Sequence, residues 1–141
     1  MTPNELIQQM DEAEFKSRLI AELEVLASAN PDFCYTTAKH RKIAGDNIQC
    51  RYNAGPEKKE SLFSYNSSPL PCSEEQSKGC IFGRALRAMG IELGDSTLGI
   101  ASFLRASGAE TSFERKCRVI QGMQDGGARW GTLPIEGLKG L

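Results

Sequence analysis

The sequence predicts an α+β fold in which about four helices pack on a small antiparallel sheet of two or three strands. Apolar residues recur with helical spacing near both ends of the chain, and β-branched and aromatic residues gather in short runs between them. With 141 residues, 40% of them apolar and 25% charged, the chain has the size and composition of one globular domain. We expect a single domain with an N-terminal helix over residues 2–28, a sheet and loop region over 32–78, and a helical region over 79–141.

The N-terminal helix carries two start signals and one stop signal. Residues 2–5 form a capping box with Pro3 at the first helical position. Asp11 is a second candidate N-cap, with an acidic residue three positions later, which allows the helix to be interrupted near Met10. The helix is expected to end before Pro31, because a residue that precedes proline avoids helical backbone.

Three short runs with β-branched and aromatic residues are predicted strands: residues 33–37, 48–52 and 61–65. The second run alternates apolar and polar residues, which is typical of a strand buried on one face. Residues 66–79 are rich in serine and proline and are expected to form a loop, and loops of this length are often functional.

The second half of the chain is expected to hold three helices. Residues 82–89 place apolar side chains at positions i, i+3, i+4 and i+7, and Gly90 supplies the residue that follows the helix end. Asp95 or Ser96 is expected to cap the next helix, which ends at Gly108.

The third of these helices is expected to have Ser112 as its N-cap and to run to about Met123. Cys117 and Ile120 share its inner face with Met123, and two glycines follow its last turn. Trp130 is predicted to close over the core, because a large aromatic side chain near the end of a small domain has most to gain from burial.

Charge and cysteine content restrict the compartment and the partners. The formal net charge is −1, whereas proteins that bind duplex nucleic acid usually carry a clear basic excess, so a nucleic-acid partner is disfavoured. Residues 1–32 hold seven acids and two bases, which makes an acidic N-terminal segment beside a mildly basic body. The sequence shows no secretory signal and no apolar run of membrane-spanning length, so its five cysteines are expected to be reduced thiols in the cytoplasm.

Cys80 stands at a position where thiols are often reactive. It follows Gly79 at the expected start of a helix, and a helix N-terminus favours the thiolate. With His40, the only histidine, Cys80 would form a minimal nucleophile–base pair in a cysteine-dependent enzyme. The alternative is a small buried cysteine that packs a helix against the sheet, and the absence of a nucleophile motif favours that alternative.

A zinc site is disfavoured by the spacing of its candidate ligands. Neighbouring candidates are separated by at least five residues, whereas zinc sites that a sequence reveals contain pairs two to four residues apart. The candidates are Cys34, His40, Cys50, Cys72 and Cys80. We therefore expect no metal, and no other cofactor is indicated.

Basic side chains offer a candidate anion site. Arg84 and Arg87 lie three residues apart on one predicted helix, and a second basic cluster consists of Lys39, Arg41 and Lys42. Arginine binds phosphate and carboxylate groups through two parallel hydrogen bonds. If the two sets converge, they would bind a small anionic ligand such as a nucleotide; otherwise they are solvated faces of helices.

A helix-turn-helix is also disfavoured. Residues 90–94 separate two predicted helices in the manner of that motif, but the second helix, over residues 97–105, has a single basic residue. Recognition helices are usually richer in arginine, lysine, asparagine and glutamine. DNA binding is therefore not the expected function.

Several short motifs resemble a pattern in small uncharacterised proteins of actinobacteria and their phages. The motifs fall within residues 12–131, at Asn30–Tyr35, Cys50–Tyr52, Gly79–Leu86 with Met89 and Gly90, and Gln121–Gly127 with Trp130 and Gly131. This resemblance implies a compact accessory protein of the kind that phages encode.

The leading hypothesis is a non-enzymatic binding protein that acts on a host protein partner in defence or regulation. It depends on the missing catalytic signature, the uneven charge and the resemblance. A protein that binds nucleotides or other small anions, and a cysteine-dependent enzyme, are the alternatives. The identity of the partner and the oligomeric state stay open.

Overall fold

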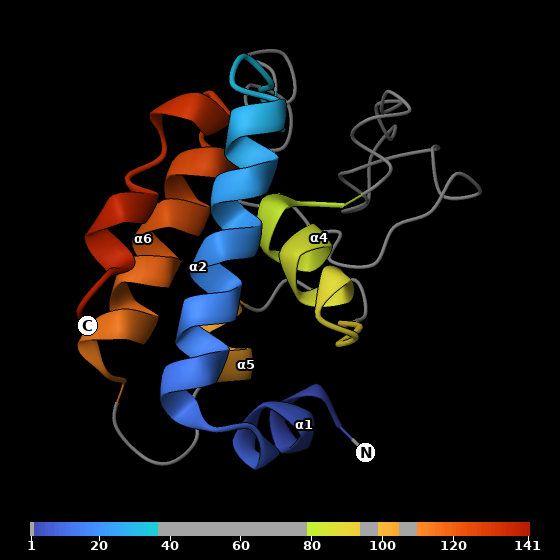
Figure 1. Ribbon diagram of the computed structural model, residues 1–141. Coiled ribbons are helices and arrows are strands. Elements are labelled where there is room, and N and C mark those ends of the chain that lie inside the picture. The colour runs from blue at the N-terminus through green and yellow to red at the C-terminus, as the bar shows by residue number, and fades with distance from the viewer. Residues whose placement is uncertain (1, 37–78, 94–98, 105–109) are drawn as a thin grey trace, which may run out of the picture.

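The computed structural model describes residues 2–36, 79–93, 99–104 and 110–141. These ranges contain the helices α1 (Pro3–Gln9), α2 (Glu12–Ala29), α4 (Ile81–Ala88), α5 (Ile100–Leu104) and α6 (Ser112–Asp125), and the 3-10 helices η3 (Trp130–Thr132) and η4 (Ile135–Leu138). In Figure 1, α2 stands between α6 and α4, and α1 lies at the end of α2 where that helix begins. Both 3-10 helices pack against α2, and η4 also packs against α6. None of the helices in the described ranges has the length and apolar character that crossing a membrane requires.

The predicted α+β class is wrong for the described part of the chain, which is helical and contains no sheet. The first predicted strand, residues 33–37, is described as far as residue 36 and forms one isolated antiparallel bridge, between Cys34 and Arg129. The predicted strands at 48–52 and 61–65 lie outside the described residues, as does nearly all of the predicted loop.

Among the described residues, Phe33 of the first predicted strand packs against the 3-10 helix η3. Tyr35 is fully buried, and the ring of Phe33 meets the ring of Trp130 edge-on, with 4.7 Å between the centroids. β-propensity measures how well a side chain fits a half-buried extended surface. Here the ring of Trp130 supplies such a surface for Phe33, and no ladder forms within the described residues.

The helix signals near the N-terminus are confirmed. The Thr2 hydroxyl accepts a hydrogen bond from the Glu5 amide, and the Glu5 carboxylate accepts one from the Thr2 amide, which completes the capping box. The predicted break falls at Met10. Asp11 then caps α2 by accepting a hydrogen bond from the amide of Glu14.

The helices of the second half are also confirmed, with two corrections. Helix α4 ends as expected at Gly90, whose φ of +83° is readily available only to glycine. The N-cap of α6 is Thr111 and not Ser112: the Thr111 hydroxyl accepts from the Glu114 amide, and the Glu114 carboxylate accepts from the Thr111 amide. Met123 was expected to face inward and is 38% exposed. The middle helix is confirmed as α5, but its predicted cap and end lie outside the described residues.

Two glutamines of α6 tie the shorter helices to the core. The buried side-chain oxygen of Gln124 accepts a hydrogen bond from the Ile81 amide at 2.8 Å, and that of Gln121 accepts one from the Ile100 amide at 2.7 Å. Ile81 and Ile100 are the first residues of α4 and α5, where backbone N–H groups have no partner within the helix. Helix α6 therefore fixes where both helices begin.

Candidate functional site

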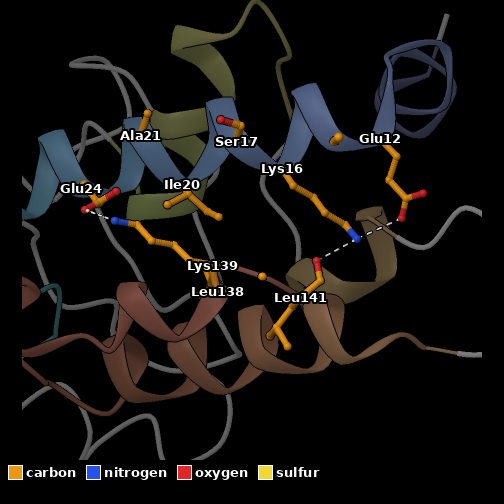
Figure 2. A pocket seen from close by; sticks show the side chains of 11 residues that line it. Glu12, Lys16, Ser17, Ile20, Ala21, Glu24, Leu138, Lys139 and Leu141 are labelled. Carbon is orange, nitrogen blue, oxygen red and sulfur yellow. Dashed lines mark hydrogen bonds and ion pairs between the residues drawn. The ribbon is translucent and has the colours of Figure 1, made fainter.

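An open groove of about 650 Å³ runs along the outer side of α2 (Figure 2). One wall is α2 and the other is the segment of residues 138–141. Its uncharged lining comprises Ala13, Ser17, Ile20, Ala21, Leu138, Gly140 and Leu141, and its charged lining comprises Glu12, Lys16, Glu24 and Lys139. We call this feature the α2 groove.

The groove is open because one row of α2 carries small side chains. Ala13, Ser17 and Ala21 follow one another at four-residue intervals, so they lie above one another on the same helix face. All three are exposed, and the row continues with Val25, which is 62% exposed. Long charged side chains usually occupy such positions on a soluble helix, so this face is unusually smooth and apolar.

Lysine side chains bridge the groove near both ends, as the dashed lines of Figure 2 show. The Lys16 ammonium lies 3.0 Å from a Glu12 oxygen and donates a hydrogen bond of 3.1 Å to the backbone oxygen of Leu141. The Lys139 ammonium lies 3.4 Å from Glu24 and 3.2 Å from Glu136. The hydrogen bond with Glu136 and the charges of both carboxylates raise the pKa of Lys139 above its ordinary value.

The charged side chains that line the groove are balanced, two carboxylates against two lysines, but helix α2 as a whole is acidic. Residues 11–29 hold five acids and two bases. Lys16 pairs with Glu12 and Lys139 pairs with Glu24, whereas Glu14 and Glu22 have no ion pair among the described residues. An apolar floor within an acidic surface suits a ligand that presents apolar groups flanked by positive charges.

A second hollow adjoins the first at Glu12 and Lys16, which line both. It has a volume of about 480 Å³ and lies among α1, the start of α2, the end of α5 and the start of α6. Its lining comprises Ile7, Gln8, Met10, Glu12, Phe15, Lys16, Leu104, Thr111, Phe113 and Glu114. We call it the α1–α6 pocket.

Cys80 has a structural role in this arrangement. Its thiol is fully buried and acts as the N-cap of α4, where the sulfur accepts a hydrogen bond from the Gly83 amide at 3.4 Å. His40, its predicted partner, lies outside the described residues. The enzyme hypothesis stays a prediction, and the geometry at Cys80 favours the packing alternative.

The predicted anion site is described only in part. Arg84 donates from Nε to the backbone oxygen of Gly79 at 3.0 Å, and its guanidinium lies 4.8 Å from the ring centroid of Trp130 and 5.5 Å from that of Phe33. These contacts hold Arg84 against the core. Arg87 follows one turn later on α4 and is half-buried. The remaining members, Lys39, Arg41 and Lys42, lie outside the described residues.

The described cysteines do not form a metal centre. Cys34, Cys80 and Cys117 are free thiols, and the described ranges contain no group of three or more cysteine, histidine, aspartate or glutamate side chains that could hold a metal ion. His40, Cys50 and Cys72 lie outside those ranges. Burial and the nearby charge of Glu114 raise the pKa of the Cys117 thiol to about 12, with Lys16 acting in the opposite direction.

Asp125, the last residue of α6, has a perturbed carboxyl group. Burial raises its pKa from 3.8 to about 6, while a hydrogen bond of 2.9 Å from the Gln124 amide opposes the increase. The backbone oxygen of Asp125 accepts a hydrogen bond from the Thr36 hydroxyl at 2.7 Å. The ionised carboxylate therefore stands at the point where α6 meets the segment that follows α2.

Asp125→Asn is expected to raise the free energy of unfolding above pH 6 by about 1 kcal/mol. This value is smaller than the free energy that corresponds to the full pKa shift, because the side chain is partly exposed. The folded-state pKa lies above the unfolded one, so the stability that protonation supplies is lost as the pH rises from about 4 to about 6. Asparagine can keep the contact with Gln124 and does not titrate. Urea unfolding at about pH 3.5 and about pH 8 measures the difference, which should vanish at the lower pH. An equal difference at both pH values would contradict the assignment.

No protein-family model, curated protein or solved structure matches the chain. The resemblance to small proteins of actinobacteria and their phages therefore stays a prediction.

Sequence reasoning missed both hollows. The α1–α6 pocket and the contact between Lys16 and Leu141 bring together residues that are about a hundred positions or more apart, which no local pattern reveals. One signal was present in α2. Small residues recur at four-residue intervals along one face, whereas the rest of the helix carries many charged side chains. That row could have marked the α2 groove.

Proposed function

We propose that the protein is a non-enzymatic binding protein whose α2 groove takes an amphipathic, basic segment of a partner protein. The observation that carries the proposal is the smooth, exposed row of Ala13, Ser17 and Ala21 beside an open groove on an acid-rich helix. A helix or extended segment can approach such a row closely, because the short side chains leave its backbone accessible. The resemblance noted in the sequence favours an accessory role of the kind phages encode, with a host defence or regulatory protein as the partner.

The charge argument specifies the partner segment. Glu14 is exposed on α2, and Glu22 follows on the same helix; neither has an ion pair among the described residues, whereas Glu24 is paired with Lys139. A segment with apolar residues on one face and lysine or arginine beside them would bury the groove lining and meet these carboxylates. Because the carboxylates are at the surface, the attraction should weaken as salt is added.

Ala21→Arg tests the groove directly. Arginine at position 21 would fill the groove and add a positive charge, so a fluorescent synthetic helix with a leucine face flanked by lysines should bind at least tenfold more weakly. Fluorescence anisotropy measures the affinity for the wild-type protein and the variant. Ala88→Arg is the matched control, because Ala88 is exposed at the end of α4 and lines neither hollow.

The same peptide with glutamates in place of the lysines tests the charge argument. It should bind more weakly than the basic peptide, and the difference should shrink in high salt. Equal binding of the two peptides, or equal loss of affinity in both arginine variants, would show that the α2 groove is not the binding surface.

A further inference from the structure

The α1–α6 pocket combines apolar walls with a buried carboxylate. Five of its lining side chains are apolar, namely Ile7, Met10, Phe15, Leu104 and Phe113. Its volume of about 480 Å³ is in the range of pockets that hold small organic ligands. Glu114 also lines the pocket and is only 6% exposed.

Glu114 is held in place by the start of α6. Its Oε2 accepts a hydrogen bond of 2.6 Å from the Thr111 amide, and it occupies the third position of the helix. The partial positive charge of a helix N-terminus favours a negative charge there. The hydrogen bond from the backbone amide therefore fixes the orientation of the Glu114 carboxylate.

No cation in the described part of the chain lies within ion-pair distance of Glu114. Lys16 is the one basic residue among the described residues that line the pocket, and its ammonium lies 3.0 Å from Glu12 and 5.2 Å from the ring centroid of Phe113. Within the same described residues, the second carboxylate oxygen of Glu114, Oε1, accepts no hydrogen bond. Oε1 does not belong to the fully buried polar atoms that lack a partner, so a ligand can reach it, and a cation or a hydrogen-bond donor would satisfy it.

The neighbouring thiol of Cys117 is also affected by the negative charge of Glu114. Cys117 lies one turn after Glu114 on α6, and its pKa is raised by burial and by the charge of Glu114. Lys16 acts in the opposite direction and by less than either cause. The interior beside the pocket therefore disfavours a further negative charge.

We propose that the α1–α6 pocket binds a small amphiphilic cation, a primary ammonium that carries an apolar body. The ammonium would donate to the vacant oxygen of Glu114, and the apolar body would lie against Phe15, Leu104 and Met10. An anion is disfavoured by Glu114 and Glu12, and a neutral apolar molecule would leave the carboxylate unpaired. This site adjoins the α2 groove at Glu12 and Lys16 but has its own walls, and the proposal does not depend on the proposed function.

Titration with hexylammonium and with hexan-1-ol tests the site, because the two probes share an alkyl chain and differ in charge. Binding is followed by two-dimensional NMR of the ¹⁵N-labelled protein, with shifts expected at the amides of the residues that line the pocket. Hexylammonium should bind at least tenfold more tightly than hexan-1-ol. Equal affinities, or hexylammonium shifts that fall outside the pocket, would overturn the proposal.

Glu114→Gln removes the negative charge and preserves the capping box at the start of α6, since glutamine can also complete this motif. This variant should bind hexylammonium at least tenfold more weakly than the wild type, whereas its affinity for hexan-1-ol should be unchanged. Met10→Trp fills the pocket from a half-buried position and should weaken both probes. If Glu114→Gln bound both probes as the wild type does, the carboxylate would have no part in recognition and the proposal would be wrong.

Ala21→Arg separates this proposal from the proposed function. Ala21 lines the α2 groove and does not line the α1–α6 pocket. The variant should therefore keep its affinity for hexylammonium while it loses affinity for the basic peptide. A parallel loss of both ligands would show that the pocket does not bind the ammonium independently and would overturn the proposal.

Discussion

Trp130→Ala is expected to lower the free energy of unfolding by about 3–5 kcal/mol, the range found for large aromatic residues removed from a core. The Trp130 side chain is fully buried. Its ring packs edge-on against Phe33 with 4.7 Å between centroids, and the Arg84 guanidinium lies 4.8 Å from its centroid. Its loss would leave a cavity between the segment after α2 and the start of α4. Urea unfolding followed by far-ultraviolet circular dichroism measures the change.

Trp130→Phe is the matched control for the aromatic packing. The indole N–H of Trp130 is buried and has no hydrogen-bond partner in the structure as described. Replacement by phenylalanine therefore reduces the volume of the ring without breaking a hydrogen bond, and it removes the unsatisfied indole donor. We expect it to cost about 1 kcal/mol, well below the alanine variant. Equal losses in the two variants would show that the indole N–H has a partner that stabilises the fold.

The helices could be predicted from the sequence because their start and end signals are local. The capping box at Thr2 and Glu5, the N-cap at Asp11 and the left-handed Gly90 each depend on residues within one or two turns. Such signals act through hydrogen bonds to the nearest backbone groups, so tertiary packing seldom changes them. The N-cap of α6 differed by one residue, because Ser112 and Thr111 are both good caps and only Thr111 has a glutamate three residues later.

The sheet could not be predicted correctly because β-propensity does not identify what a side chain packs against. Phe33 has the composition of a strand residue, yet its ring packs against Trp130 of η3. A strand also needs a partner with unpaired backbone groups alongside it. Within the described ranges, the segment finds only Arg129 for one bridge and Trp130, whose amide donates to the Phe33 oxygen at 3.0 Å.

The candidate site was predicted less well than the helices because it arises between segments that are distant in sequence. Lys16 and Leu141, which meet at one end of the α2 groove, are separated by 125 positions. Glu114 was not singled out as a binding residue, since its capping box with Thr111 does not show that it is buried beside a pocket and away from the cations of the described residues. By contrast, the residue types that drew attention as chemistry, such as Cys80 and Arg84, serve the packing of α4.

Gly131→Ala is expected to destabilise the protein by about 2 kcal/mol, within the range for forcing extra atoms into a packed site. A Cβ at this position would lie 2.8 Å from the backbone oxygen of Pro31 and 2.9 Å from its Cβ. Backbone and ring atoms cannot rotate away as a flexible side chain can. The Gly131 amide also donates to the Pro31 oxygen at 2.9 Å, so any movement that relieves the clash would weaken this hydrogen bond.

Gly122→Ala makes the same chemical change where nothing opposes it. Gly122 is exposed within α6, and a Cβ there would have no atom within 4 Å. Alanine is a better helix former than glycine by about 1 kcal/mol, so this variant should be more stable than the wild type. Thermal and urea unfolding of both variants should therefore shift in opposite directions. If Gly131→Ala were neutral or stabilising as well, η3 would not lie against the turn after α2, and the placement of Trp130 over the core would be wrong.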